Sequence, residues 1–420
     1  MERPGMSQGR LIVACDFGST QFRALVTEIT GSGDLEVVGC ARHEASGFQD
    51  GDFVDIKSAA RGIRACMQDL EADSNIYISG FTYNIAGSHL HSVQAKAQVP
   101  ITSGPRPIRQ ADVDKVLKQA RSMAIPFDQK ILTVTPEEYA VDRVRGITDP
   151  LGRVGSQLEV TAHLVTGSRS VLSNIQTTIG EARFKGLGEE VDILAVGMAL
   201  LEEQEKQQGV MLVDIGGEMT SWAVFRQGGI LANGSLPWGG KHLTMDLAHG
   251  LRLDWGQAED LKRERGVVLR SLVPEVAISA LFTEEKPEAS QGLIAAILEP
   301  RMEEILTMVK NDFGDMRELA TLGAGIVLTG GGSRCQGTRR LCEEIFDLQV
   351  AKRYLPRWLE GAEQLPEDQW ATAIGLCRWA ARDVVAAQPE EIGQEKGGLL
   401  GRLRGMFKRA DSEDELVARG

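Results

Sequence analysis

Residues 210–225, VMLVDIGGEMTSWAVF, carry the strongest fold signal in this chain. An apolar run of β type stops at Asp214, turns on Gly216 and Gly217, and returns through a second apolar run, which predicts a strand, a tight turn and a strand. Such a turn presents bare backbone N–H groups and one carboxylate. Glycine lets the backbone approach a phosphate closely, and a carboxylate holds Mg²⁺ through its waters, so the turn suits a metal-bound phosphate.

A second hairpin of the same kind lies near the N-terminus, in residues 13–26 (VACDFGSTQFRALV). There Asp16, Gly18, Ser19 and Thr20 repeat the order of acid, turn and small polar residues. One such hairpin alone is more often an ordinary β-turn, because Gly and Asp are default turn residues. Two copies far apart in the chain instead predict two similar domains facing one phosphate.

Length and composition bound the class of protein. A chain of 420 residues with 42% hydrophobic content can bury a large core, which predicts at least two domains. The net charge of −13 argues against nucleic-acid binding, which needs clustered Lys and Arg. The six cysteines form no C-x-x-C pair, the first ten residues lack the apolar core of a signal peptide, and the six histidines show no zinc-ligand spacing. A reducing cytoplasm fits these features.

Hydrophobic periodicity predicts a mixed α/β chain around the two hairpins. The predicted helices cover residues 56–70, 110–123, 172–184, 257–264, 293–309, 337–346 and 370–385, with Gly239 and Gly240 ahead of another helix. The predicted strands cover residues 76–86, 131–134, 158–165 and 191–196.

A third glycine-rich turn, IVLTGGGS at residues 326–333, follows a strand, and its glycines can pack against a flat adenine ring. With these three turns the chain resembles the actin, sugar-kinase and heat-shock chaperone ATPase superfamily. Further stretches resemble the FtsA family of bacterial cell-division proteins. They are TPEEYAVDRV (135–144), ITDPLG (147–152), WGGKHLTMDLA (238–248), AEDLK (258–262), ILEPRMEEIL (297–306) and QWATAIGL (369–376).

The resemblance implies an α/β, actin-like two-domain ATPase fold with an inserted 1C-type α+β subdomain and a C-terminal amphipathic helix. The expected segments are subdomain 1A at residues 11–83, 167–208 and 366–387, subdomain 1C at 84–166, subdomain 2A at 209–242 and 311–355, and subdomain 2B at 243–310. A linker at 388–397, a membrane-targeting helix at 398–409 and an acidic tail at 410–420 are expected to follow.

Carried over residue by residue, the resemblance implies an ATP site between the hairpins. The expected ATP contacts are Asp16, Gly18, Ser19, Thr20, Asp214, Gly216, Gly217, Gly239, the ribose contacts Glu259 and Lys262, and the adenosine turn Gly330, Gly331, Gly332 and Ser333. Asp16 and Asp214 are expected to hold Mg²⁺ through water.

The second hairpin departs from the family pattern D-x-G-x-G-T-x-D, because Glu218, Met219 and Ser221 stand at three of its positions. A glutamate about 4 Å from a phosphate repels it by roughly 1 kcal/mol in water and about 4 kcal/mol at an effective dielectric constant of 20. Glu218 is therefore expected to point outward, to help hold Mg²⁺, or to weaken binding. Because of these departures, ATP hydrolysis is expected to be slow or absent.

The C-terminal stretch GGLLGRLRGMFKR predicts a basic amphipathic helix. One arc of about 120° holds the apolar residues Leu399, Leu400, Leu403, Met406 and Phe407, and outside it lie Arg402, Arg404, Lys408 and Arg409. This pattern is typical of a helix lying on an anionic membrane surface. The alternative is a terminal core helix, which four glycines and the polar tether ahead of the stretch disfavour.

The resemblance implies an adaptor that binds ATP, self-associates into filaments, and anchors filaments of the tubulin-like protein FtsZ (the Z ring) to the cytoplasmic side of the inner membrane at the division septum. The C-terminal peptide of FtsZ is expected on the predicted helix 293–309, at Glu299, Arg301 and Glu304, although such charges are usually only a solvated helix face. A small-molecule kinase, which transfers the γ-phosphoryl group to a sugar or carboxylate, and a PilM-like pilus-assembly ATPase are the alternatives. The amphipathic helix and the inserted block favour the adaptor.

Overall fold

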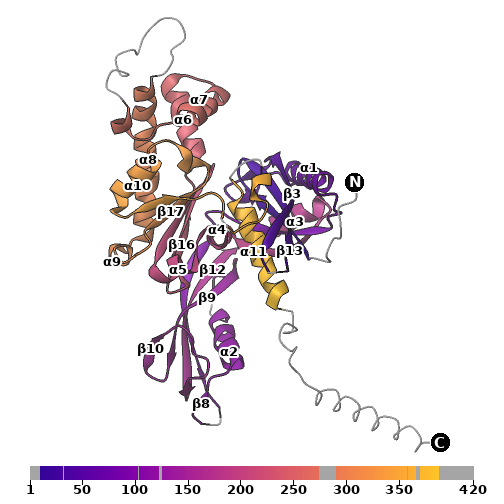
Figure 1. Ribbon diagram of the computed structural model, residues 1–420, viewed down its shortest axis with the longest axis vertical. Coiled ribbons are helices and arrows are strands. Elements are labelled where there is room, and N and C mark those ends of the chain that lie inside the picture. The colour runs from indigo at the N-terminus through magenta and orange to yellow at the C-terminus, as the bar shows by residue number, and fades with distance from the viewer. Residues whose placement is uncertain are drawn as a thin grey trace, which may run out of the picture. The chain divides into compact units, whose positions relative to one another are not determined.

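The computed structural model describes residues 10–386 apart from 32, 103, 123–124, 274–289, 357 and 366–368, and of 383–386 only the backbone. The chain divides into two units, residues 1–380 and 381–420, and the fold below is that of the first unit (Figure 1). The linker, amphipathic helix and acidic tail predicted at residues 388–420 lie outside the described residues.

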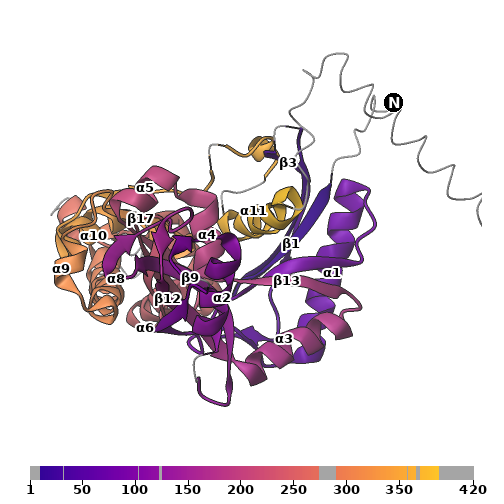
Figure 2. The ribbon, with the colours of Figure 1, turned by 90° about the horizontal axis from the view of Figure 1, so that it is seen from below.

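The first sheet contains the N-terminal hairpin and has the strand order β13-β6-β1-β2-β3. Its strands are β1 (Leu11–Phe17), β2 (Gln21–Ile29), β3 (Leu35–Glu44), β6 (Gly80–Ile85) and β13 (Lys185–Val191). β1 and β2 pair antiparallel, which confirms the predicted hairpin, and β6 runs parallel to both β1 and β13. Helices α1 (Ile56–Ser74) and α3 (Arg169–Glu181) lie on one face of this sheet, and α11 (Ala371–Ala386) lies on the other (Figure 2).

Helix α1 shows how local sequence sets these elements. It begins at Asp55, whose carboxylate accepts a hydrogen bond from the backbone N–H of Ser58 and so caps a free donor of the first turn. It ends at Asn75, which adopts the left-handed conformation at φ 57°. The helix buries one face against the sheet because its apolar residues recur at helical spacing. That buried face consists of Ala59, Ala60, Gly62, Ile63, Cys66, Met67 and Leu70.

The second sheet repeats the arrangement of the first, in the order β16-β15-β14-β17-β18. Its strands are β14 (Val210–Ile215), β15 (Thr220–Arg226), β16 (Gly229–Leu236), β17 (Ile326–Thr329) and β18 (Val350–Lys352). β14 and β15 form the predicted antiparallel hairpin, and β17 runs parallel to β14. Both sheets therefore consist of three antiparallel strands and two parallel ones, and the first strand of each antiparallel meander, β1 or β14, carries the acid near its carboxyl end.

Helices α6 to α10 complete the second domain. They are α6 (Gly240–Leu251), α7 (Trp255–Arg265), α8 (Gln291–Phe313), α9 (Met316–Leu319) and α10 (Thr338–Phe346). Residues from α6, α7, α8 and α10 join β14, β15 and β17 in one buried apolar cluster. The two domains also contain the short helix α5 (Glu203–Gln208) and a two-stranded sheet formed by β4 (Phe48–Gln49) and β5 (Asp52–Phe53).

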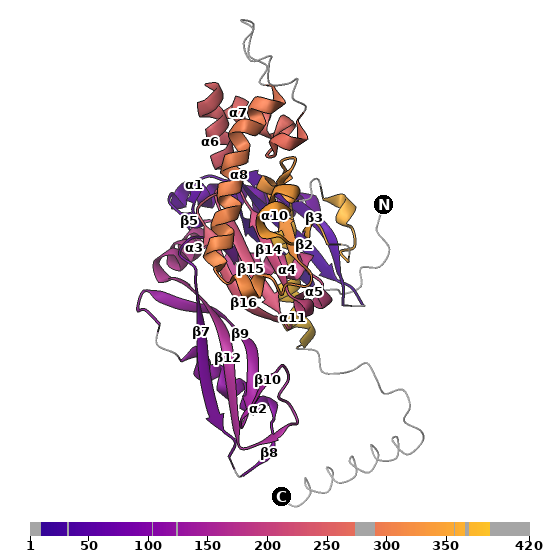
Figure 3. The same ribbon diagram turned by 90° about the vertical axis from the view of Figure 1, so that its left-hand side faces the viewer.

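An inserted domain lies between β6 and α3 and forms a sheet of its own (Figure 3). The sheet has the order β10-β9-β12-β7 and consists of β7 (His91–Pro100), β9 (Gln129–Val141), β10 (Val144–Ile147) and β12 (Gln157–Ser168). Helix α2 (Gln110–Arg121) packs on it through Val113, Val116 and Ala120, and β8 (Arg106–Pro107) pairs with β11 (Val154–Gly155).

The predicted strand at residues 191–196 is wrong. Strand β13 ends at Val191, and helix α4 (Asp192–Leu200) begins at the next residue. Seven of the nine residues of α4 are buried, so its sequence DILAVGMAL has no polar face from which helical periodicity could be recognised. The predicted helices are confirmed, with ends shifted by a few residues. No helix among the described residues is long and apolar enough to cross a membrane.

Candidate functional site

A cleft of about 1440 Å³ lies between the two hairpin turns. Most of the predicted site residues line it: Asp16, Gly18, Ser19, Thr20, Asp214, Gly216, Gly217, Glu259, Lys262, Gly330, Gly331 and Gly332. The three glycine turns therefore meet at one cleft, as expected from hairpins at equivalent ends of two similar sheets.

Gly239 and Ser333 do not line this cleft but hold the residues that do. A Cβ atom on Gly239 would lie 2.7 Å from the carbonyl oxygen of Gly216 and 2.8 Å from that of Gly217, so the chain packs there directly against the second turn. The hydroxyl of Ser333 donates to the carbonyl oxygen of Gly330 at 2.8 Å, within the third turn. Gly239 and Ser333 therefore stabilise the turns that line the cleft.

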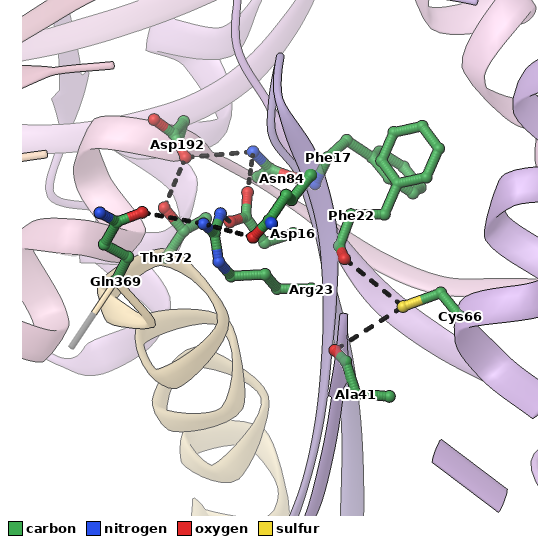
Figure 4. A network of polar contacts seen from close by, with 11 residues as sticks. Asp16, Phe17, Phe22, Arg23, Ala41, Cys66, Asn84, Asp192, Gln369 and Thr372 are labelled. Atoms are coloured by element: carbon green, nitrogen blue, oxygen red, sulfur yellow. Dashed lines mark hydrogen bonds and ion pairs between the residues drawn. The ribbon is translucent and has the colours of Figure 1, made fainter. Parts of the chain in front are cut away.

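Three carboxylates, Asp16, Asp192 and Asp214, line the cleft, and Asn84 connects the first two (Figure 4). Asn84 donates from its side-chain nitrogen to Asp16 at 3.3 Å and to Asp192 at 3.1 Å. The hydroxyl of Thr372, at the start of α11, donates to the same Asp192 oxygen at 3.0 Å. Strand ends and two helices thus bring the acids together.

Arg23 supplies positive charge beside these acids. It is 7% exposed, its guanidinium lies 3.8 Å from the Asp16 carboxylate, and it donates to Gln369 at 2.9 Å (Figure 4). Its Nε is buried and has no hydrogen-bond partner among the described residues. Arg23 adds one positive charge to the three negative charges of the acids, so these four described residues together carry excess negative charge when all three acids are ionised.

The pKa values of the carboxyl groups reflect this imbalance. Burial raises the pKa of Asp214 to about 8, and the charges of Asp192 and Asp16 add to the effect. Burial also raises the pKa of Asp16 to about 7, against the opposing charge of Arg23. The pKa of Asp192 is raised by burial, although hydrogen bonds from Thr372 and Asn84 oppose the shift.

Such an acid group fits a hydrated divalent cation, because oxygen ligands and uncompensated negative charge are what Mg²⁺ requires. The expectation for Asp16 and Asp214 is contact through water. The described residues contain no group of three or more His, Cys, Asp or Glu side chains that could hold a metal ion directly. Water and ligand oxygens would therefore have to supply most of the coordination.

Glu259 and Lys262, the predicted ribose contacts, form one ion pair on the second-domain side of the cleft. The Lys262 ammonium donates to Glu259 and to the Thr244 hydroxyl, at 2.7 Å each, and to the carbonyl oxygen of Gly240 at 2.9 Å. Burial acts to raise the pKa of Glu259, but hydrogen bonds from Lys262 and Thr244 outweigh it and lower the pKa to about 2. The acid is ionised at neutral pH and can accept hydrogen bonds from sugar hydroxyls.

The sequence left three roles open for Glu218: an outward orientation, help in holding Mg²⁺, or weaker binding. The structure excludes the outward orientation. The Glu218 side chain is 14% exposed and pairs with Lys241. Met219 and Ser221 also line the cleft, and the Ser221 hydroxyl lies 3.2 Å from that of Ser235 on β16.

The predicted partner residues lie on α8 and outside the cleft lining, and most of their charge is paired within the chain. Arg301 donates to both carboxylate oxygens of Asp246 on α6, at 2.7 and 3.2 Å, and to Glu304 at 2.5 Å. Glu299 accepts from the backbone N–H of Arg270 at 2.8 Å. Arg301 is only 21% exposed, whereas Glu304 is half exposed, so Glu304 is the more accessible of the two. The predicted membrane residues lie outside the described part of the chain.

Sequence reasoning missed the residues that connect the hairpins to their surroundings. These are Arg23, Asn84, Asp192, Lys241, Gln369 and Thr372. Asn84 could have been found, because it stands at the end of a predicted strand next to the first hairpin. The others needed the tertiary structure.

The two equivalent sheets, each with an acid–glycine hairpin facing one cleft, define an actin-like ATPase fold. Solved structures share it. The PilM-PilN type IV pilus biogenesis complex matches with a TM-score of 0.61 and 16% identity, over 90% of this chain and 99% of that chain. MreB5 of Spiroplasma citri bound to ADP matches with a TM-score of 0.54 and 14% identity, over 90% and 98%.

Family models and relatives then identify the particular family. Residues 87–166 match the SHS2 domain inserted in FtsA, and residues 211–375 match the cell division protein FtsA. FtsA of Neisseria meningitidis is 32% identical over 409 residues, which cover 94% of this chain and 98% of that protein. FtsA of Pseudomonas aeruginosa is 32% identical over 375 residues, covering 88% and 89%. The chain belongs to the FtsA family of cell-division proteins.

Proposed function

We propose that this chain is an actin-like cell-division adaptor that binds ATP and Mg²⁺, self-associates, and anchors FtsZ filaments to the cytoplasmic face of the inner membrane at the septum. The observation that carries the proposal is the meeting of three glycine turns at one cleft, in a chain of the FtsA family. A small-molecule kinase shares the superfamily, but family membership favours the adaptor.

The nucleotide part of the proposal rests on the chemistry of the cleft. Gly18, Gly216 and Gly217 offer backbone that phosphate oxygens can approach, and Asp16 and Asp214 offer charge for a hydrated Mg²⁺. Gly331 borders the cleft without a side chain, so a flat base can lie against it. Bound Mg²⁺ would neutralise phosphate charge. Slow or absent turnover is proposed because Glu218 and Met219 replace small residues of the second turn.

The partner and membrane parts rest on two separate segments. The half-exposed Glu304 and the neighbouring Arg301 on α8 offer charge for the C-terminal peptide of FtsZ, with modest affinity because exposed pairs contribute about 0.2 to 1 kcal/mol each. The apolar arc and basic residues of 398–409 fit an anionic lipid surface.

A co-sedimentation experiment tests the combined function. The purified full-length chain is mixed with FtsZ and anionic liposomes, with or without ATP and Mg²⁺. We expect FtsZ to enter the lipid pellet only when this chain is present, and more of it with MgATP. FtsZ that stays in the supernatant under all conditions contradicts the adaptor. Isothermal titration with MgATP tests the nucleotide site separately.

A further inference from the structure

The turns of the two hairpins touch each other across the cleft. A Cβ atom on Gly217 of the second turn would lie 2.7 Å from Oγ of Ser19 and 2.8 Å from Cγ2 of Thr20, both in the first turn. The backbone N–H of Glu218 donates to the Ser19 hydroxyl at 3.2 Å. At this point the two domains are in direct contact.

The carboxylate of Glu218 lies in this junction and is held from both sides. It pairs with the ammonium of Lys241 in α6, and it accepts a hydrogen bond from the backbone N–H of Asp50 at 3.1 Å. Asp50 belongs to the loop between β4 and β5 of the first domain. Lys241 in turn donates to the carbonyl oxygen of Ser19 at 3.4 Å. The four residues form a clamp between the domains, which we call the Glu218 clamp.

The partners of Glu218 are groups that also bind phosphate. Backbone N–H groups and ammonium groups both donate to phosphate oxygens, and here they meet beside two phosphate-type turns. A carboxylate occupies that position instead. A phosphate placed close to Glu218 would be repelled by it, so the phosphate and the clamp compete for the same donors.

We propose that Glu218 is a built-in anion that takes the place of the terminal phosphate of a nucleoside triphosphate and holds the two domains together. Nucleotide would then displace Glu218 from Lys241 and from the Asp50 N–H, and the clamp would open as the site fills. This inference rests on the proposed function, because it assumes that the cleft binds nucleotide. It assigns Lys241 as a phosphate contact that the sequence did not predict.

Nucleotide titration of Glu218→Gln tests the competition. The substitution keeps the shape of the side chain and removes its charge. We expect it to tighten MgATP binding about tenfold, as the removal of one nearby like charge permits, and to change AMP binding less than about twofold. Lys241→Gln should weaken MgATP binding, and the double variant should resemble Lys241→Gln. Glu303→Gln, with the same loss of charge on the exposed side of α8, should bind as the parent does.

A second measurement needs no nucleotide. Hydrogen exchange of the Asp50 amide in the nucleotide-free chain should be faster in Glu218→Gln than in the parent or in Glu303→Gln, because the hydrogen bond to the carboxylate is weakened. Equal MgATP affinity of the parent and Glu218→Gln overturns the inference while leaving the nucleotide site intact. If neither the parent nor any variant binds nucleotide, the proposed function fails instead. In that case an equal rate of Asp50 amide exchange in the parent and in Glu218→Gln also overturns the clamp.

Discussion

The side-chain amide of Asn84 donates to Asp16 at 3.3 Å and to Asp192 at 3.1 Å, while its oxygen accepts from the backbone N–H of Phe17 at 2.7 Å. The Phe17 bond fixes the orientation of the amide, because a backbone N–H can only donate. The nitrogen is thereby aimed at the two acids. Asn84 thus connects the first hairpin to helix α4 and lets two carboxylates lie close together.

Asn84→Asp tests this role, because aspartate has the same shape but cannot donate when ionised. The substitution adds a fourth carboxylate to the acid group and removes two hydrogen bonds. We expect it to lower the free energy of unfolding by about 2 kcal/mol or more. The loss should be greater at pH 8 than at pH 6, where more of the acids stay protonated. Urea unfolding at the two pH values measures it, and an equal loss at both would contradict the role assigned to Asn84.

The raised pKa values of Asp16 and Asp214 predict a pH-dependent stability. In the folded chain these values are about 7 and 8, against the ordinary value of 3.8. Between about pH 4 and 8 the folded chain therefore binds more protons than the unfolded chain, and the stability from these groups falls as the pH rises. We expect the Tm of the nucleotide-free chain to decrease from pH 6 to pH 8.5.

Asp214→Asn provides the control for this pH effect. The variant removes one titrating group and relieves the repulsion on Asp16, so its Tm should decrease less over the same range. Added Mg²⁺ should raise the Tm of the parent more at pH 8.5 than at pH 6, since a cation prefers the ionised acids. Thermal unfolding in matched buffers decides the matter. A parent Tm that rises with pH would show that other groups dominate.

A matched pair of glycine substitutions tests the packing of α11 on α4. A Cβ atom on Gly375 would lie 1.8 Å from the carbonyl oxygen of Ala195, so Gly375→Ala must push the two helices apart. We expect a loss of about 1 to 3 kcal/mol in the free energy of unfolding. Gly180→Ala in α3 meets no atom within 4 Å and should instead add up to about 1 kcal/mol. Denaturant unfolding of both variants measures the difference, and similar effects of the two changes would refute the packing.

Local chemistry explains why the hairpins and most helices could be predicted from the sequence. The second turn is specified by Asp214, Gly216 and Gly217 between two apolar runs, and α1 is specified by the Asp55 cap and its apolar spacing. Those signals lie within a few residues of each other. The antiparallel part of each sheet, β1-β2-β3 and β14-β15-β16, follows from the short turns between consecutive strands.

The rest of the site depends on contacts between distant residues. Asp192 was missed because β13 has the unusual strand sequence KGLGEEV, while the apolar run after it forms a buried helix. Arg23 meets Gln369 across 346 positions of the chain, and no periodicity reports such a pairing. The pairing of Glu218 with Asp50 likewise depends on how the two domains meet.

Arg301 is paired within the chain, so a substitution there affects stability as well as the proposed FtsZ surface. Arg301→Glu should reduce binding of the FtsZ C-terminal peptide about two- to fivefold, the effect of one partly exposed ion pair. It also brings a new acid against Asp246 and Glu304, so lost stability could explain the same result. The exchange variant Asp246→Arg/Arg301→Asp retains an ion pair between α6 and α8. It should recover most of the Tm that Arg301→Glu loses and still bind the peptide weakly in fluorescence anisotropy. Undiminished binding by Arg301→Glu rules this surface out.

The last prediction concerns membrane attachment by residues 398–409. Gly401 and Gly405 each cost about 0.8 to 1 kcal/mol of helix propensity, and a helix of this length is marginal alone, so we expect helix only on lipid. Burying the five apolar side chains at about 1.5 kcal/mol or more apiece offsets the cost of ordering, and each basic residue adds about 1 kcal/mol at an anionic surface. Attachment should therefore need both the burial of the apolar side chains and the attraction of the basic residues to anionic lipid.

Phe407→Glu removes part of the apolar term and places a negative charge against anionic lipid, so the variant should remain in the soluble fraction in liposome flotation. Deleting residues 411–420 removes four acidic side chains beside the lipid and should retain or strengthen attachment. The deletion also serves as the control for a general effect of changing the C-terminus. Attachment of the parent should weaken in neutral liposomes, because the basic residues then lose their partner. If the Phe407→Glu protein floats like the parent, this segment is not the membrane anchor.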